Sequence, residues 1–394
     1  MDSRPAQRIL SYLRERLHEM VELLELLVRV ESPSVVPECQ DQILGMIEAV
    51  LAKISYAVRR VRGPDYGAHL YARPKQRLRR QPVQLLLGHC DTVWPLGTLR
   101  EMPLLTGEGI MRGPGVYDMK AGLVQMMYAL KALHDLELRP PLTPLVFINS
   151  DEEIGSREST RYIRCLARLS ERAFVLEPSL GLEGKLKTAR KGVGRFTVTV
   201  KGKAAHAGLD PQGGASAILE LSHVIQKLFA LNDPDKGITV NVGMIDGGLR
   251  PNVVAPESRA IVDVRVASAE DGRLVEERIL NLPPTTPGVV LQIEGRIGRS
   301  PMTLTPRNQT LWELARSAAG EIGLELAHGS AGGGSDGNTT SLYTATLDGL
   351  GAVGDGAHAR HEFIYFDKMV ERSALLALLL IAPPAQEGLQ LVQP

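Results

Sequence analysis

The sequence predicts an α/β protein, in which a mostly parallel sheet with flanking helices is interrupted by a smaller α+β domain. Three observations support this fold class. The chain has 394 residues, more than the roughly 250–300 at which a single core stops growing, so we expect two domains. Short apolar runs alternate with helical segments in the first half. Residues 190–300 contain alternating apolar and polar positions, typical of half-exposed strands.

Three short apolar runs define the expected parallel sheet. They are Val83–Leu87, Leu145–Ile148 and Phe174–Leu176, and their continuous apolar character is typical of strands buried on both faces. Residues 120–136, between the first two runs, have the periodicity of an apolar helix. Strands joined by helical connections favour a largely parallel arrangement.

The middle of the chain predicts a different domain. Its segments follow the order strand, helix, strand, strand, helix, strand, which is the split βαβ order of ferredoxin-like domains. We therefore assign residues 190–300 to an inserted ferredoxin-like domain, and residues 1–189 and 301–394 to the two parts of the first domain. A helix at 309–323 marks the return of the chain to that first domain.

The N-terminal and basic segments carry weaker signals. Residues 1–30 have apolar residues at helical spacing among many charges, which predicts one amphipathic helix. This segment lacks the pattern of a signal peptide, and no stretch approaches the roughly 20 apolar residues of a membrane span. Residues 59–82 are basic and broken by Pro and Gly. They predict a solvated hairpin or loop, with an acidic partner as the alternative.

Composition gives no sign of a polyanionic partner. Lys+Arg and Asp+Glu both number 45, and this balance predicts neither nucleic-acid binding nor binding to an anionic membrane. The three cysteines, Cys39, Cys90 and Cys165, are an odd and sparse set. They offer no disulfide framework and favour a reducing compartment, so we expect a cytoplasmic protein.

Acidic and histidine residues follow each apolar run. In an open parallel sheet, ligands bind outside the carboxyl ends of the strands, so these side chains should converge in one crevice. A Gly-rich turn before a helix adds Asp118, and a second Gly-rich stretch near the C-terminus adds His358, His361 and Glu362. The residues that follow the three runs are His89, Asp91, Asp151, Glu152, Glu153 and Glu177.

This collection of side chains suits a metal centre. Zinc prefers His nitrogen and carboxylate oxygen, and two zinc ions roughly 3.5–4 Å apart can act together on one substrate. Glu152 would stay off the metal as the general base, and Asp91 would fix the tautomer of its neighbouring imidazole. The structural alternatives are a solvated helix start for Glu152 and Glu153, and an N-cap for Asp118. The five candidate ligands are His89, Asp118, Glu153, Glu177 and His358.

The motifs together resemble the M20 peptidases, which include glutamate carboxypeptidases, aminoacylases, acetylornithine deacetylases and succinyl-diaminopimelate desuccinylases. The matching segments are LLLGHCDTVWP, GPGVYDMKAGL, NSDEEIGS, LEPS, RKGVGRFTVTVKGKAAHAG, NVGMIDGGLRPNVVAPESRAIVDVR and GAHARHEF. They follow the family's order over nearly the whole chain. Met119 after Asp118, and Val193 with Gly194, favour the glutamate carboxypeptidase branch.

The resemblance implies a zinc-peptidase-like fold with two Zn²⁺ per subunit, which Co²⁺ or Mn²⁺ can replace. His89 and Glu177 would bind one zinc ion, Glu153 and His358 the other, and Asp118 would be shared. Glu152 matches the family's general base, which takes a proton from a water between the metals, and Asp91 matches its orienting carboxylate. His358 is preferred to His361 because an acidic residue follows it four positions later.

The resemblance also assigns roles to the inserted domain, which would act as a dimerisation (lid) domain and form a homodimer. His206 matches a histidine that reaches the partner subunit's active site and donates a hydrogen bond to the substrate carbonyl, a contribution typically worth about 3–4 kcal/mol. Asn252 and Arg265 match substrate-binding positions, and a guanidinium suits a free carboxylate. The alternative for Arg265 is an exposed cross-strand ion pair.

The loop from Gly329 to Asn338 resembles a GGGSD-type substrate loop whose backbone N–H groups could bind a carboxylate; a flexible linker is the alternative. Its candidate residues are Gly333, Gly334, Ser335 and Asp336. The expected activity is metal-dependent cleavage of an amide bond beside a free carboxylate, as in glutamate carboxypeptidases. The alternatives are an N-acyl amino acid deacylase, distinguished by a substrate panel, and an inactive binding protein, distinguished by zinc binding without turnover.

Overall fold

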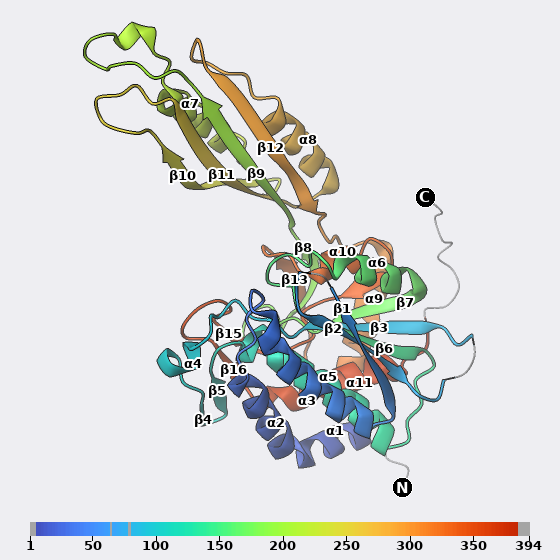
Figure 1. Ribbon diagram of the computed structural model, residues 1–394. Coiled ribbons are helices and arrows are strands. Elements are labelled where there is room, and N and C mark those ends of the chain that lie inside the picture. The colour runs from blue at the N-terminus through green and yellow to red at the C-terminus, as the bar shows by residue number, and fades with distance from the viewer. Residues whose placement is uncertain (1–4, 64, 78–79, 385–394) are drawn as a thin grey trace. The chain divides into compact units, whose positions relative to one another are not determined.

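Figure 1 shows the chain as a computed structural model that describes residues 5–63, 65–77 and 80–384. It divides into two compact units. The larger unit takes in the chain up to Thr188, Leu304–Ser330 and the chain from Ser335 onward. The smaller unit consists of Ala189–Thr303 and Ala331–Gly334. Part of the Gly-rich loop therefore belongs to the smaller unit.

A six-stranded sheet in the order β1-β2-β6-β3-β7-β14 forms the centre of the larger unit. Strands β6, β3, β7 and β14 run parallel to one another, whereas β2 pairs antiparallel with β6 and β1 pairs antiparallel with β2. The predicted mostly parallel sheet is confirmed. The strands are β1 (Tyr56–Arg62), β2 (Ala68–Pro74), β3 (Val83–His89), β6 (Thr143–Asn149), β7 (Ser170–Val175) and β14 (Ala345–Leu347).

Apolar cores cover both faces of this sheet, which explains why its strands are continuous apolar runs. Leu86 of β3 points into the larger core, whereas Leu85 and Leu87 point into a smaller core that includes Ile163. The helix behind the smaller core is α6 (Thr160–Leu169). The larger core is built with α1 (Pro5–Glu15), α2 (Leu17–Arg29), α5 (Ala121–Asp135), α9 (Pro306–Glu321) and α11 (Lys368–Ile381).

Shorter elements complete the larger unit. Helix α3 (Gln40–Lys53) packs against β1 and β2. A second sheet has the order β15-β16-β5-β4 and carries the C-terminal Gly-rich stretch. Its strands are β4 (Leu105–Gly107), β5 (Ile110–Arg112), β15 (Gly354–Asp355) and β16 (Phe363–Tyr365). The remaining elements are η1 (Pro37–Cys39), α4 (Thr98–Glu101), η2 (Val116–Lys120), α10 (Asp336–Thr340), and the paired strands β8 (Leu186–Arg190) and β13 (His328–Ala331).

The smaller unit has the predicted ferredoxin-like order. Its antiparallel sheet has the order β10-β11-β9-β12. Alternate residues of β9, such as Phe196 and Val198, are buried in a separate core beneath the two helices. The side chains of Ser216 and Ser268 cap the two helices by accepting N–H bonds from their first turns. The elements are β9 (Gly192–Lys201), η3 (Pro211–Gly213), α7 (Ala217–Phe229), β10 (Thr239–Gly247), β11 (Glu257–Val266), α8 (Ala269–Leu280) and β12 (Val290–Arg299).

Two sequence predictions are corrected by this structure. The single N-terminal helix is two helices, α1 and α2, which meet at Arg16. Its guanidinium lies 3.7 Å from the centre of the Tyr12 ring and bonds to the Tyr12 carbonyl, so local contacts replace a continuous helix.

Among the described residues, none of the helices combines the length and apolar character needed to cross a membrane.

The basic segment at 59–82 is a hairpin, but it is less solvated than predicted. Strand β2 is a member of the central sheet, and its residues Leu70 and Ala72 are buried. Arg60 on β1 forms ion pairs with Asp41 and Glu48 of α3, at 3.1 and 3.2 Å. The chain itself therefore supplies acidic partners for part of this segment. Residues 64, 78 and 79 lie outside the described residues.

Candidate metal centre

The first half of the candidate site is formed where β3 ends. His89 is its last residue and is only 1% exposed. The His89 Nδ1 atom lies 2.9 Å from the Asp91 carbonyl oxygen, so Nδ1 carries the proton and donates it to that carbonyl. The His89 Nε2 atom then faces Asp118 Oδ1 at 3.2 Å and Glu177 Oε1 at 3.6 Å. Nε2 therefore faces two carboxylates, and a metal ion could take the place of a proton there.

The second half is formed by the C-terminal Gly-rich stretch and the turn after β6. His358, with φ of 60° and a half-exposed side chain, places Nε2 3.1 Å from Glu153 Oε2 and 3.5 Å from Asp118 Oδ2. The neighbouring His361 is exposed, and the described ion pairs do not include it. The structure therefore brings His358, and not His361, to Asp118 and Glu153.

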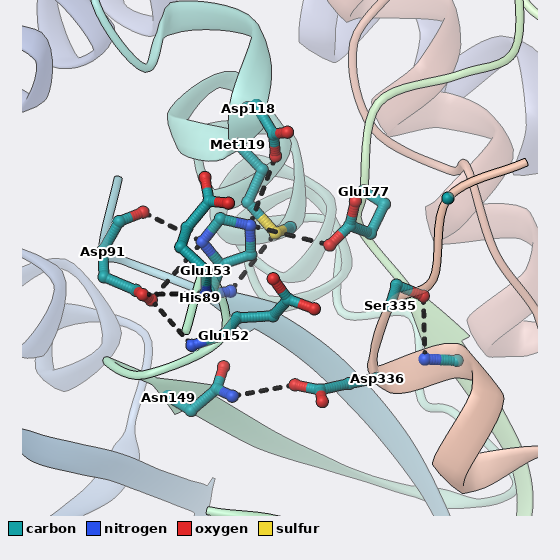
Figure 2. Close-up of polar contacts among 12 residues, drawn as sticks. His89, Asp91, Asp118, Met119, Asn149, Glu152, Glu153, Glu177, Ser335 and Asp336 are labelled. Carbon is teal, nitrogen blue, oxygen red and sulfur yellow. Dashed lines mark hydrogen bonds and ion pairs between the residues drawn. The ribbon is translucent and has the colours of Figure 1, made fainter. Parts of the chain in front are cut away.

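Asp118 lies between the two halves. One of its carboxylate oxygens faces His89 and the other faces His358. It sits in the irregular η2 segment, and the peptide bond to Met119 is cis. Figure 2 shows the carboxylates of Asp118, Glu153 and Glu177 gathered around the His89 ring. The five segments of the sequence that predicted a metal site thus converge at the carboxyl ends of the parallel strands.

This donor set fits a metal centre. Ligand atoms of His89, Asp118 and Glu153 lie within 4.8 Å of one another, and so do those of His89, Glu152 and Glu177. The buried Oε1 atom of Glu153 has no hydrogen-bonding partner among the described residues. An orphaned buried carboxylate oxygen is costly unless a cation completes its coordination. The mixture of imidazole nitrogen and carboxylate oxygen is the kind that zinc accepts.

The electrostatics of the cluster also favour a cation. Burial raises the pKa of Glu153 to about 7, although a hydrogen bond from His358 opposes this. Hydrogen bonds to Asp118 and Glu153 raise the pKa of His358 to about 10. Burial opposes charge on His89, yet bonds to Asp118 and Asp91 raise its pKa well above the usual value. Burial likewise acts against charge on Asp118, but the two imidazoles outweigh it and hold its pKa low. The carboxylates thus favour protonation of the two imidazoles. A divalent ion would supply the same positive charge in place of these protons.

Asp91 organises the turn that carries the two glutamates. Its Oδ2 accepts bonds from Ser34 Oγ at 2.7 Å and from the Glu153 N–H at 3.1 Å, and its Oδ1 accepts from the Glu152 N–H at 3.3 Å. The Asp91 carboxylate oxygen is 3.5 Å from His89 Nδ1, farther than its own carbonyl oxygen. The carbonyl is therefore the nearer acceptor for the imidazole, and the carboxylate mainly fixes the 152–153 backbone.

Sequence reasoning named Glu362 but gave it no role, and it missed Trp94. The buried Glu362 carboxylate accepts the indole N–H of Trp94 at 2.8 Å and backbone N–H groups of the Asp118 turn. Burial raises the pKa of Glu362 to about 7, while these N–H bonds act to lower it. The only sequence signal was the spacing of an acidic residue four positions after His358. A bond between a carboxylate and distant backbone leaves no pattern in the sequence.

The Gly-rich loop is more ordered than a linker. The Gly333 and Gly334 carbonyls each accept a bond from Arg190 Nη1 at 3.1 Å. Ser335 is buried, caps α10 and donates to Asp348 at 2.5 Å. Asp336 is also buried and accepts bonds from Asn149 and Ser156, as Figure 2 shows for Asn149. The last two side chains are thus used within the protein, which leaves backbone groups as the part of this loop suited to a ligand.

The other predicted substrate residues belong to the smaller unit. His206 is exposed, and its Nδ1 accepts bonds from the N–H groups of Gly208 and Leu209 at 3.2 and 3.1 Å. The carbonyl of Asn252 accepts the Ala207 N–H at 3.0 Å, so the two loop segments that carry Asn252 and His206 pair with each other.

Arg265 pairs with Asp263 two residues earlier on β11. Its Nε is 2.7 Å from Asp263 Oδ1, and its Nη2 is 3.0 Å from Asp263 Oδ2. The partner lies on the same strand and the same face, so the pair is not the cross-strand pair considered from sequence. The bidentate geometry is the one that a guanidinium adopts with a substrate carboxylate.

Known proteins share both the sequence motifs and the fold. Residues 85–382 match Peptidase family M20/M25/M40. Carboxypeptidase G2 of Pseudomonas sp. (strain RS-16) is 27% identical over 376 residues, covering 92% of this chain and 88% of that protein. Acetylornithine deacetylase of Myxococcus xanthus is 30% identical over 192 residues, covering 46% and 48%. The crystal structure of aminopeptidase PepT from Bacillus cereus superposes with a TM-score of 0.74 at 21% identity, covering 93% and 97%.

The family match covers most of the chain and includes the segments that carry His89, Asp118, Glu153, Glu177 and His358. The structural likeness extends over both units. The chain therefore belongs to peptidase family M20/M25/M40 and is a metal-dependent hydrolase.

Proposed function

We propose that the protein is a two-zinc hydrolase that cleaves an amide bond beside a free carboxylate, with the specificity of a glutamate carboxypeptidase. The observation that carries the proposal is the placement of Asp118. Its two oxygens face two different imidazoles, each of which also faces a second carboxylate. One shared carboxylate between two His–Glu pairs is the arrangement expected of a two-metal site.

In this proposal, His89 and Glu177 would hold one zinc ion, His358 and Glu153 would hold the other, and Asp118 would be shared. When bound, the zinc ions lower the pKa of a water molecule and polarise the substrate carbonyl. The chain's own residues set the geometry for this chemistry. The carbonyl of Asp91 keeps the proton of His89 on Nδ1, so that Nε2 is available as a ligand.

Glu152 is proposed as the general base. Its backbone N–H is held by Asp91, and a carboxylate oxygen of Glu152 lies within 4.8 Å of ligand atoms of both His89 and Glu177. This position suits a carboxylate that takes a proton from the attacking water and returns it to the leaving amine. The same position would also allow Glu152 to act as a ligand, so its role is tested by a variant that retains zinc.

His206 is proposed to stabilise the substrate carbonyl from the partner subunit of a homodimer. Two backbone N–H groups donate to its Nδ1, so the proton of the neutral ring is on Nε2. An exposed Nε2–H is a preorganised donor, suited to the negative charge that develops on the carbonyl oxygen. His206→Ala is expected to lower kcat by about 10²–10³-fold, with zinc content unchanged.

Dimerisation is proposed to use one edge of the smaller unit's sheet. Strand β10 is one of the two edge strands, and its Met244 and Ile245 are 68% and 67% exposed. Ile218 and Leu219 of α7 are also exposed apolar residues. An apolar edge strand is suited to pairing with a second copy. Ile245→Lys is expected to give a monomer in analytical ultracentrifugation; an unchanged dimer would contradict this choice of edge.

Arg265, Asn252 and the Gly333–Asp336 loop are proposed to bind the free carboxylate. A substrate carboxylate would take the place of Asp263 as the bidentate partner of Arg265. Because the side chains of Ser335 and Asp336 are already bonded, the loop would contribute the N–H groups of Gly333 and Gly334. Arg265→Lys keeps the charge and loses the fork, so we expect a higher KM and a smaller change in kcat.

The alternative is an N-acyl amino acid deacylase, favoured by the match to acetylornithine deacetylase. The two functions share a mechanism and differ in which part of the substrate is varied. The test is a panel of N-acyl-glutamates beside N-acetylornithine and N-succinyl amino acids, with chelated protein as control. Glutamate release that chelation abolishes and zinc restores is the expected result. Turnover confined to N-acetylornithine or N-succinyl substrates would move the assignment to the deacylase.

A further inference from the structure

Glu362 is a buried carboxylate beside the metal centre that neither ligand set includes. It lies in the loop between β15 and β16, immediately before β16, and its side chain is fully buried. Asp118 is among the charged groups that act on it. A buried acid facing another acid is unfavourable unless donors surround it, so its retention here calls for a physical reason.

Four donors surround the Glu362 carboxylate. Oε1 accepts the N–H groups of Tyr117 and Asp118 at 2.9 and 3.0 Å. Oε2 accepts the N–H of Gly115 at 2.9 Å and the indole N–H of Trp94 at 2.8 Å. These bonds match the roughly four lone-pair sites of a carboxylate. Glu362 is therefore saturated by protein donors and is not suited to be a metal ligand itself.

Three of the four donors belong to the turn that presents Asp118. This turn begins at Gly115, which has φ of 72°, and Asp118 itself has non-helical backbone angles. An irregular turn cannot pair all of its N–H groups with its own carbonyls, so an outside acceptor must bond to them. Glu362 supplies two acceptor oxygens on one rigid side chain, and its second oxygen is held in turn by Trp94.

The backbone of Glu362 also forms hydrogen bonds that fix the loop that carries His358. The Glu362 N–H donates to the Ala359 carbonyl at 3.0 Å, and the Gly113 N–H donates to the Glu362 carbonyl at 3.3 Å. The main chain of Glu362 thus forms the hydrogen bonds that hold the His358 loop, and its side chain accepts the N–H groups of the Asp118 turn. These two segments supply the Nε2 and Oδ2 atoms that face each other at 3.5 Å.

We propose that Glu362 is a positioning residue, which fixes the Asp118 turn so that the two oxygens of Asp118 face two separate zinc sites; the inference rests on the metal centre of the proposed function. Trp94 orients the carboxylate of Glu362. Protein donors occupy both oxygens of the Glu362 carboxylate, so we infer that both residues act through the Asp118 turn. Outer partners of this kind typically contribute about 10–100-fold to metal affinity.

The test compares Glu362→Gln with a matched carboxylate elsewhere. The amide introduced by this substitution has nearly the same volume as the carboxylate, but in either orientation its NH₂ group faces two N–H donors. Glu31 is the control, because its carboxylate also accepts two backbone N–H bonds, from Gly97 and Leu99 at 2.7 and 2.9 Å, in the loop after the first motif. Trp94→Phe is an intermediate variant that removes only the indole donor.

The readouts are the zinc affinity of chelated full-length protein, measured by competition with a coloured chelator, and the visible absorption spectrum of the Co²⁺ form. We expect Glu362→Gln to bind zinc about 10–100-fold more weakly and to change the Co²⁺ spectrum. Trp94→Phe should have a smaller effect, and Glu31→Gln should match the wild type. The thermal midpoint of each chelated variant reports on general folding.

Two results would overturn the inference without touching the proposed metal centre: wild-type zinc affinity in Glu362→Gln with only a lower thermal midpoint, or equal loss of affinity in Glu31→Gln. A wild-type protein that binds no zinc would also overturn it, together with the proposed metal centre. If the wild type binds zinc but cleaves none of the amides, the proposed function fails. A selective loss of zinc affinity in Glu362→Gln would still support the positioning role in that case.

Discussion

Two buried carboxylates, one in each unit, are held in opposite ways. Glu220 of α7 is fully buried, and its oxygens accept N–H bonds from Thr285 and Thr286 at 2.6–3.0 Å. Burial acts to raise its pKa, but these bonds outweigh burial and the pKa is lowered. Glu153 in the metal centre has a pKa raised to about 7 by burial, and its Oε1 has no hydrogen-bonding partner in the described chain.

The difference separates a structural carboxylate from a proposed metal ligand. At Glu220, the protein completes the hydrogen bonds of the acid with its own backbone, and Lys227 adds a favourable charge. At Glu153, one buried oxygen has no hydrogen-bonding partner in the described chain, a cost that a cation at the proposed metal site would offset. Activity should therefore require metal, and the stability of the larger unit should depend partly on it. The stability of the smaller unit should not depend on metal.

The largest expected effect is that of Asp118→Ala. Removing the shared ligand should lower kcat/KM by at least about 10³-fold, because metal ions contribute several kcal/mol to catalysis and each 1.4 kcal/mol is tenfold. Bound zinc, measured by atomic emission after gel filtration, should fall below two per subunit. Asp235→Ala, at an exposed position of the smaller unit, is the control. Wild-type zinc content in Asp118→Ala would contradict a shared ligand.

Glu152→Gln should have a comparable effect on rate but not on metal. Loss of a general base typically lowers kcat by about 10²–10⁴-fold, and the uncharged amide leaves the proposed ligands in place. Steady-state kinetics and zinc content, measured together, check this prediction. Glu321→Gln, at an exposed position on α9, serves as the control. Retained activity would remove Glu152 from the mechanism, and loss of zinc would make it a ligand.

Zinc should stabilise the two units unequally. A ligand present at about a thousand times its Kd stabilises the folded state by about 4 kcal/mol, and this gain should be confined to the larger unit. Hydrogen exchange with and without zinc can locate the change. Peptides that contain His89, Asp118 and Glu153 should become more protected, while peptides of β9 and β11 should not change. Equal protection in both units would contradict the comparison.

The smallest expected effect concerns Glu220. Replacing it by Gln should lower the free energy of unfolding by about 1–3 kcal/mol at pH 7, because one charged acceptor is lost. Its folded pKa is lower than its unfolded value, so its contribution is present above pH about 4.3 and disappears as pH falls through the folded pKa. Urea unfolding at several pH values should therefore show that the difference in unfolding free energy between the wild type and Glu220→Gln shrinks towards acid pH. The control is Glu294→Gln, at an exposed position, for which no such change is expected.

Much of the fold and site could be predicted because the relevant signals are local. The apolar runs ended at the carboxyl edge of the sheet, and the residues that followed them, such as His89 and Glu177, do face each other. The alternation at Phe196–Val200 likewise identified a half-exposed strand. In both cases, neighbouring residues in the sequence determine the burial of the side chain.

The features that could not be predicted depend on distant partners. Ser335 and Asp336 lie in a loop that reads as flexible, yet their side chains bond to Asp348, Asn149 and Ser156. The four donors of Glu362 lie more than 200 positions earlier in the chain. Contacts of this kind follow from the folded topology, and no spacing rule in the sequence encodes them.

The most direct test of the two-zinc mechanism is a zinc titration of chelated protein, with glutamate release from an N-acyl-glutamate and bound zinc measured on the same samples. We predict that the rate rises as zinc fills the site and reaches its maximum at two ions per subunit. Full occupancy by two zinc ions without hydrolysis of any amide in the panel would contradict the account, as would full activity in the chelated protein.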